Sequence, residues 1–377
     1  MSVSGIIFSN LHDKNIPELT RIRTMASVPF GCRYRLIDFA LSNMVNAGIT
    51  DVRVITHNNY RSLMDHLGSG KDWDLARRSG GLKLLPPYIA ATDGGDNQYK
   101  TRLDALMGAM SSVNHIDTDY VVLSDCDVIC NIDLKKVINE HEASGASITA
   151  IVKEKSFDHE KNLSHVTVID SDAEGNIVEV ANNPINCKGV KNLFMNIMII
   201  NTSELKSFLS DAVAHGYKSF MLDVIRRNMN KYKFKVYKYD GIFKNIYSLQ
   251  EYYDCNMQLI KDNSFRKALF GNKKRPILTK VRNSAPTKYS DTAKVNNSFI
   301  ADGCIIEGTV ENSILFRGVK IGKNTVVKNS ILYQDTYTGE NVFLNCVIAD
   351  KNTMIRDGRM LSGHERLPFF IEKGKMI

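Results

Sequence analysis

Acidic residues follow an apolar run in the segment "VVLSDCDVICNID", residues 121–133. The run predicts a buried strand, and a carboxylate at the carboxyl end of such a strand can hold a metal ion that is bound to phosphates. Asp133 directly precedes the helical pattern "LKKVINEH", so we assign it to the helix N-cap. Asp127 has no such role, and we therefore take it as the candidate metal ligand.

Two arginines, Arg33 and Arg35, lie close together in "GCRYR". Arginine suits phosphate because its planar guanidinium can make two parallel hydrogen bonds to one anion. His57 and Arg61 in "THNNYRSL" follow the next predicted strand and could join the same pocket. The alternative is that the two arginines pair with surface carboxylates such as Asp38, and that His57 is a structural or surface histidine.

The elements that must position these residues alternate along the first 260 residues. Strand patterns occur at "GIIF", "DVRVIT", "YVVLSD", "SITAIVK", "HVTVID" and "NIVEV", and helical patterns at "RLIDFALSNMVNAG", "YRSLMDHLG" and "LKKVINEHEASG". Alternation of this kind predicts an α/β domain with a mostly parallel, Rossmann-like sheet between helices. Ligands are then expected at the carboxyl ends of the strands.

A repeat begins at Val295, where "NSFI" at 297 returns as "NSIL" at 312 and 329 and as "NCVI" at 345. Apolar residues recur about every six positions between these returns, which predicts a parallel β-helix with three short strands per coil. The segment before the repeat has no clear helical period. We therefore expect an α/β domain over residues 1–262, a linker over 263–290 and a β-helix over 291–377.

Composition limits the classes of function. The net charge of +8 is compatible with nucleic acid, but the basic residues are spread out, and anionic small molecules explain them equally well, so we expect no nucleic-acid partner. No apolar run is long enough for a membrane helix or a signal peptide, which predicts a cytoplasmic protein without a membrane partner. Seven scattered cysteines predict buried thiols in a reducing compartment.

Three stretches together resemble bacterial glucose-1-phosphate adenylyltransferase, also called ADP-glucose pyrophosphorylase: "VPFGCRYRLIDFALSNMVNAGI", "FKNIYSLQEYYDCNM" and the repeats from "IADGCIIEGTVENSILFRGVKIG" to "VVKNSIL". The resemblance runs nearly end to end. It implies a nucleotidyltransferase domain joined to a left-handed β-helix. It also implies adenylyl transfer from ATP to glucose 1-phosphate, yielding ADP-glucose for glycogen synthesis.

The nucleotide loop departs from this family. The family's G-G-x-G-x-R-L falls on "NLHDKNI", residues 10–16, where every glycine is absent and the arginine is replaced by Asn15. Leu11 and Asp13 would crowd and repel a triphosphate, whereas Lys14 could supply a cation from one residue away.

The remaining catalytic positions are mixed. In the family's R-A-K-P, the lysine is replaced by Met25, while Arg23 is retained. The first metal aspartate matches Asp127, but the second becomes Asn245, and the sugar-phosphate lysine falls on Asn183. In "TRLDA" the family's aspartate is kept as Asp104, whereas Arg102 and Leu103 are bulkier than the pattern allows. Asp127 could still bind Mg²⁺, but the site is degraded, and we expect no required cofactor.

The losses predict a noncatalytic or weakly active regulatory subunit that stimulates a catalytic sister chain in a heterotetramer. The resemblance implies that phosphorylated sugar effectors bind near Arg33 and Arg35, together with basic residues near the C-terminal domain. Two alternatives stay open: an active enzyme with a divergent site, and a free-standing sugar-phosphate sensor. A hexapeptide acyltransferase is disfavoured because no histidine lies within the repeats, and His364 follows them.

Overall fold

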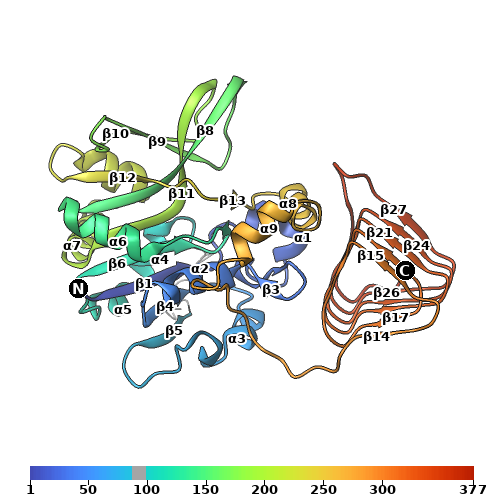
Figure 1. Cartoon of the computed structure of the whole chain (residues 1–377). Helices are drawn as coiled ribbons and strands as arrows, with labels where there is room; N and C mark the ends of the chain where they lie inside the picture. The colour runs from blue at the N-terminus through green and yellow to red at the C-terminus, as the bar shows by residue number, and fades with distance from the viewer. Residues whose placement is uncertain (87–98) are drawn as a thin grey trace.

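The computed structural model describes residues 1–86 and 99–377. Figure 1 shows an α/β unit whose last helix ends at residue 270 and a stack of short strands that begins at residue 288. The expected combination of an α/β sheet and a hexapeptide β-helix is confirmed.

Among the described residues, nine strands form the main sheet, with a continuous path in the order β10-β9-β11-β6-β1-β4-β5, while β8 pairs with β11 and β12. Their bounds are β1 Val3–Phe8, β4 Asp51–Ile55, β5 Gly81–Leu85, β6 Tyr120–Asp125, β8 Ile148–Lys161, β9 Thr167–Ser171, β10 Ile177–Asn182, β11 Cys187–Asn201 and β12 Phe234–Lys238. The strands β6, β1, β4 and β5 are parallel, and β11 joins β6 in the antiparallel sense.

Helices cover both faces of this sheet, because alternate residues of the central strands point to opposite sides. Ile7 of β1 packs in a core with α2, α6 and α8, whereas Ile6 packs with α4, α5 and α7. The helices are α1 Pro17–Thr20, α2 Ile37–Asn46, α3 Arg61–Leu67, α4 Arg102–Gly108, α5 Met110–Asn114, α6 Leu134–Ser144, α7 Thr202–His215, α8 Leu249–Lys261 and α9 Asn263–Phe270. Asp133 caps α6 by accepting a hydrogen bond from the Lys136 N–H, as expected.

Shorter elements complete the α/β unit. Two small two-stranded sheets pair β2 with β3 and β7 with β13. Their bounds, and those of the short helical turns, are β2 Pro29–Phe30, β3 Tyr34–Arg35, β7 Val128–Ile129, β13 Lys244–Asn245, η1 Asp13–Asn15, η2 Met25–Ser27, η3 Lys71–Trp73 and the π-helical turn η4 Phe220–Arg226.

The segment expected to be a linker, 263–290, is partly regular, which corrects that expectation. Its first eight residues form α9. Asp262 caps this helix by accepting hydrogen bonds from the N–H groups of Ser264 and Phe265, and the apolar side chains of Phe265 and Leu269 are buried one turn apart. An i, i+4 apolar pair after an aspartate is a helix signal that the surrounding lysines and arginines obscured.

The C-terminal unit consists of three parallel five-stranded sheets, each receiving one strand per coil, as expected of a left-handed β-helix. The sheets are β14-β17-β20-β23-β26, β15-β18-β21-β24-β27 and β16-β19-β22-β25-β28. In chain order these strands are β14 Lys288–Tyr289, β15 Lys294–Asn296, β16 Phe299–Ile300, β17 Ile305–Ile306, β18 Thr309–Glu311, β19 Ile314–Leu315, β20 Lys320–Ile321, β21 Val326–Lys328, β22 Ile331–Leu332, β23 Tyr337–Thr338, β24 Phe343–Asn345, β25 Val347–Ala349, β26 Met354–Ile355, β27 Met360–Ser362 and β28 Phe369–Ile371.

The helix α8 connects the two units. Tyr252 donates its hydroxyl hydrogen to the Pro29 carbonyl (2.5 Å) and accepts from the Tyr333 hydroxyl (2.7 Å), while Tyr253 donates to the Asn329 carbonyl (2.6 Å). Buried tyrosines need such partners, so these bonds fix the position of the β-helix against the α/β unit. Within the described residues, no helix is long and apolar enough to cross a membrane.

Candidate functional site

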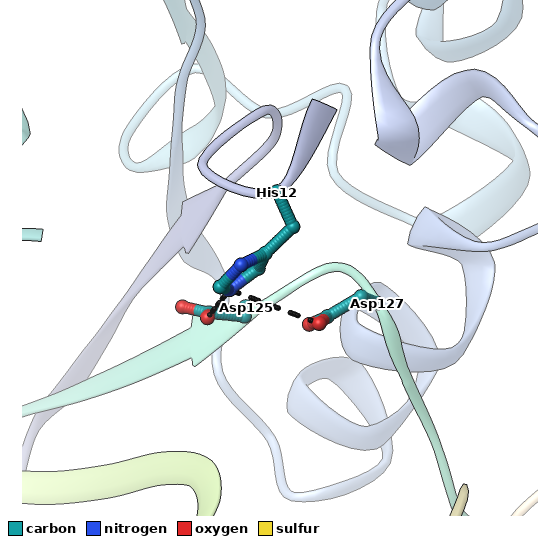
Figure 2. A group of neighbouring side chains, drawn as sticks. All are labelled: His12, Asp125 and Asp127. Carbon is teal, nitrogen blue, oxygen red and sulfur yellow. Dashed lines mark hydrogen bonds and ion pairs between the residues drawn. The ribbon is translucent and has the colours of Figure 1, made fainter. Parts of the chain in front are cut away.

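The loop after β1 and the turn after β6 leave the sheet at the same edge. The last residue of β1, Phe8, is paired with Asp125, the last residue of β6. Because the two strands are parallel, the side chains that follow them meet at their carboxyl ends. Figure 2 shows His12, from the loop after β1, pointing toward Asp125 and Asp127.

Asp125 carries most of the polar contacts at this edge. Its Oδ2 lies 2.8 Å from His12 Nε2 and 2.5 Å from a terminal nitrogen of Arg102, while its Oδ1 accepts a hydrogen bond from Arg102 Nε at 2.9 Å. Arg102 is the first residue of α4, and its guanidinium also lies over the Phe194 ring, 5.6 Å from the centroid. The guanidinium is therefore held by one carboxylate and one aromatic ring.

Asp127 has a different environment. Its side chain is fully buried, and neither carboxylate oxygen has a hydrogen-bond partner among the described residues. The nearest cationic group is the His12 imidazole, with Nε2 3.7 Å from Oδ2. A buried carboxylate without a donor is costly unless another group compensates it.

His12, Asp125 and Asp127 form one cluster of titratable side chains. Their pKa values depend on burial and on the positive charges of His12 and Arg102. Burial raises the pKa of Asp127 above its ordinary value. Burial alone would also raise the pKa of Asp125, but the charge and hydrogen bonds of Arg102 and His12 hold it below that value. For His12, burial alone would lower the pKa, whereas the Asp127 charge and the bond to Asp125 raise it. The histidine is therefore stabilised as a cation between the two acids.

The loop at residues 9–16 is closed on itself by two backbone hydrogen bonds and contains an inward-turned carboxylate. The Asp13 and Asn15 N–H groups donate to the carbonyls of Asn10 and His12 within the loop, at 3.4 and 3.0 Å. The Asp13 carboxylate turns inward to accept the Met25 N–H at 2.7 Å, and burial raises its pKa to about 8. A phosphate-binding loop needs N–H groups that converge on the anion, whereas two N–H groups of this loop are already bonded to carbonyls within it.

A magnesium ion does not fit the residues present. Asn245 takes the place expected for the second carboxylate, and β13 pairs it with Val128, next to Asp127. Its amide nitrogen donates to the Tyr247 hydroxyl, so it contributes no negative charge. Mg²⁺ prefers carboxylate oxygens and several waters. The groups beside Asp127 are instead the His12 imidazole and the Asp125 carboxylate, which is already paired with the Arg102 guanidinium.

The other predicted catalytic positions lie apart from this cluster. Arg23 points to the β-helix, where Nη2 lies 2.7 and 2.8 Å from the two oxygens of Asp350. Met25 is fully buried in the core. Asn183 is exposed in the turn between β10 and β11, with a φ of +48°. Lys14 is exposed on η1. Among the retained residues, only Asp127 is in the cluster.

Arg33 and Arg35 do share a pocket, at the junction of the two units. Its basic residues come from both parts of the chain: Arg33, Arg35, His66, Arg282, Arg317 and Lys351. The pocket is small, about 40 Å³, which suits one phosphoryl group and not a whole nucleotide. Burial, with the charges of Arg35 and Arg23, lowers the pKa of Lys351 to about 7.

Asp38, the alternative partner of the two arginines, is engaged elsewhere. Its Oδ1 lies 2.6 Å from His66 Nε2, and its Oδ2 accepts the backbone N–H of Arg35 at 3.0 Å. The Arg35 guanidinium instead donates to the Ser62 carbonyl at 2.5 Å.

His57 and Arg61 are not in the pocket of Arg33 and Arg35. His57 is buried and lines a separate cavity of about 320 Å³ next to the loop at residues 9–16, and Arg61 is exposed at the start of α3. The strand β4 ends at Ile55, so His57 emerges at the same carboxyl edge as the loop after β1. Strand order, which the sequence pattern did not supply, decides this placement.

Sequence reasoning missed His12 and Asp125 as members of the site, and treated Arg102 only as too bulky. A signal was present, because His12 follows β1 and "SDCD" follows β6. Two parallel strands that are neighbours in the sheet bring the residues after them together. The sequence did not reveal that β1 and β6 are neighbours.

Comparison with known proteins agrees with this architecture. The family model described as Nucleotidyl transferase matches residues 14–261, and the one described as GlmU-like, C-terminal hexapeptide, matches residues 284–366.

Relatives match over nearly the whole chain. The chain is 32% identical over 375 residues to the glycogen biosynthesis protein GlgD of Bacillus subtilis (strain 168), covering 98% of this chain and 95% of that relative. It is 36% identical over 377 residues to GlgD of Geobacillus stearothermophilus, covering 98% and 96%. It is 33% identical over 329 residues to the glucose-1-phosphate adenylyltransferase of Halalkalibacterium halodurans, covering 86% and 84%. These matches confirm the resemblance found in the sequence, and the protein belongs to the nucleotidyl transferase family, in the group that includes the GlgD proteins and the glucose-1-phosphate adenylyltransferases.

Proposed function

We propose that this chain is a noncatalytic or weakly active regulatory subunit in glycogen synthesis, which assembles with a catalytic glucose-1-phosphate adenylyltransferase chain and stimulates it. The observation that carries the proposal is the contact of His12 and Arg102 with Asp125. These side chains occupy the edge of the sheet where a nucleotidyltransferase needs a phosphate cradle and a magnesium ion.

Further support comes from the loop and from the relatives. Two backbone hydrogen bonds close the loop at residues 9–16 on itself, and the neutral Asn245 takes the place of a carboxylate in the expected metal site. Two GlgD relatives align over 98% of this chain, compared with 86% for the adenylyltransferase of Halalkalibacterium halodurans. The seven free, buried cysteines fit a cytoplasmic location, where thiols stay reduced.

The pocket of Arg33, Arg35 and Lys351 gives the proposed subunit a means of regulation. It joins residues of the α/β unit to residues of the β-helix, so an anion bound there contacts both units. A phosphorylated sugar is the effector class that we propose for it. Such a ligand stabilises the arrangement of the two units that it binds best.

The test is an assay of adenylyl transfer from ATP to glucose 1-phosphate with this chain alone, with a catalytic chain alone and with the mixture. We expect no turnover for this chain alone and a higher kcat or a lower KM for the mixture. Robust turnover by the chain alone would refute the proposal and favour an active enzyme with a divergent site. No effect on the catalytic chain, together with direct binding of a sugar phosphate, would favour the free-standing sensor.

A further inference from the structure

The group His12, Asp125 and Asp127 is arranged like a metal centre that differs from the expected magnesium site. Each residue offers one ligand atom, and these three atoms lie within 4.8 Å of one another. Metal–ligand bonds of about 2.0–2.2 Å place two ligands of one ion roughly 3–4.4 Å apart. The separation of 3.7 Å between His12 Nε2 and Asp127 Oδ2 falls in this interval, and the 2.8 Å to Asp125 lies just below it.

Asp127 supplies independent evidence for a missing ligand. Its side chain is fully buried, and both of its oxygens lack a hydrogen-bond partner among the residues that the structure describes. Buried polar atoms are nearly always satisfied by protein, water or an ion. Figure 2 shows this carboxylate facing the His12 ring across a short gap.

The surrounding residues orient the three ligands. Arg102 binds both oxygens of Asp125, which fixes the plane of that carboxylate and offsets one of the two negative charges. The Tyr247 ring lies edge-on to the His12 ring, with centroids 6.0 Å apart. Such outer contacts hold ligating side chains in one orientation.

We propose that His12, Asp125 and Asp127 bind a divalent transition-metal ion, with Zn²⁺ as the best fit. One imidazole, which releases its Nε2 proton to solvent when the ion binds, and two carboxylates form a nitrogen and oxygen donor set. Zn²⁺ accepts this set in tetrahedral geometry, with a fourth position left for water or a ligand. Mg²⁺ is disfavoured because it avoids imidazole and keeps several waters. The proposal does not rest on the regulatory function, and it assigns no catalytic step to the ion.

The ion would attach the loop after β1 to the end of β6. His12 lies on that loop, while Asp125 ends β6 and Asp127 follows it. The bound ion would therefore rigidify the loop at residues 9–16.

The experiment uses the untagged full-length chain, stripped with a chelator and titrated by calorimetry with Zn²⁺ and, in parallel, with Mg²⁺. Co²⁺ is added in a second experiment, because tetrahedral Co²⁺ gives an intense visible spectrum. We expect one Zn²⁺ per chain, a tetrahedral Co²⁺ spectrum and much weaker binding of Mg²⁺. The variants His12→Gln and Asp127→Asn should each weaken Zn²⁺ binding at least ~10-fold.

A matched control changes the same residue types on the surface. His215→Gln and Asp211→Asn both lie exposed on α7, away from the cluster, and should leave Zn²⁺ affinity unchanged. Circular dichroism verifies that each variant is folded. If Asp127→Asn does not fold, His12→Gln still tests the site, because the His12 side chain is partly exposed. Absence of stoichiometric Zn²⁺ and Co²⁺ binding, or equal binding by both cluster variants and the wild type, would overturn the proposal. His12 and Arg102 would then act only as internal counter-ions for the two acids.

Discussion

Arg23 and Asp350 form a buried ion pair between the α/β unit and the β-helix, with Arg23 Nη2 2.7 Å from one carboxylate oxygen and 2.8 Å from the other. Their side chains are only 2% and 1% exposed. The guanidinium also lies 5.9 Å from the centre of the Tyr333 ring. Arg23 therefore joins the two units of the chain, although the family resemblance implies a catalytic role for it.

Arg23→Ala should destabilise the chain by about 3–5 kcal/mol, because it leaves the Asp350 carboxylate buried without a partner. Urea denaturation, followed by fluorescence and circular dichroism, measures the change. Arg21→Ala is the matched control, since Arg21 pairs with Glu372 between the same two units but both side chains are exposed. That change should cost about 0–1 kcal/mol. Equal losses from the two variants would contradict a special role for the buried pair.

Restoring the family's lysine at position 25 should harm the chain. Met25 is fully buried among apolar residues, so Met25→Lys places an unpaired ammonium in the core and should cost ~3 kcal/mol or more. Met64→Lys on α3, where the methionine is 52% exposed, is the control and should change stability by less than ~0.5 kcal/mol. Thermal unfolding compares the two. A Met25→Lys variant as stable as the wild type would mean that the side chain finds an exit to solvent.

Binding of a sugar phosphate in the junction pocket should depend on pH through Lys351. Its pKa of about 7 is depressed by burial and by neighbouring cations, and a bound phosphate would raise it. Below pH 7 the lysine is already charged, whereas above pH 7 binding must take up a proton. Affinity for a sugar monophosphate, with glucose 6-phosphate as the probe, should therefore fall as the pH rises from 7 to 9. Calorimetry in buffers of different ionisation enthalpy detects the proton uptake, and Lys351→Met should abolish the uptake.

The same depressed pKa affects folding. Lys351 in the folded chain binds its proton more weakly than in the unfolded chain, where its pKa is near 10.5. Its contribution to stability is therefore most favourable above pH 10.5 and is lost as the pH falls to about 7. Lys351→Met should stabilise the chain most below pH 7, as measured by thermal unfolding across pH. A constant difference between pH 6 and pH 10 would indicate that the ammonium stays hydrated.

Substitutions should show that Arg33 and Arg35, which line the junction pocket, bind the sugar phosphate, and that His57 and Arg61, which lie outside it, do not. Arg35→Ala should weaken binding of the sugar phosphate about 10-fold or more, because it removes a charged donor from a junction pocket. Arg61→Ala should leave the affinity unchanged, since Arg61 does not line the pocket and is exposed at the start of α3. Calorimetry with both variants decides. A comparable loss in Arg61→Ala would place the binding site elsewhere.

The sequence by itself determined the α/β alternation, the coils of the β-helix and the absence of a glycine loop, because these depend on local periodicity and on residue type. Apolar residues every six positions lead to stacked coils whatever surrounds them, and Asp133 caps α6 through bonds within its own turn. The sequence misjudged residues 263–270, where a single apolar pair on one face of a short helix is too weak a pattern. Arg33 and Arg35 line one pocket, since they are two residues apart, and their binding of a phosphorylated effector stays a prediction.

Only the tertiary structure decided which distant residues meet. His12 and Asp125 are 113 positions apart, and they touch because β1 and β6 are neighbours in the sheet. Arg23 and Asp350 are 327 positions apart, and they meet because α8 holds the β-helix against the α/β unit. Strand order and domain packing are set by the burial of whole faces, and no local sequence pattern encodes them.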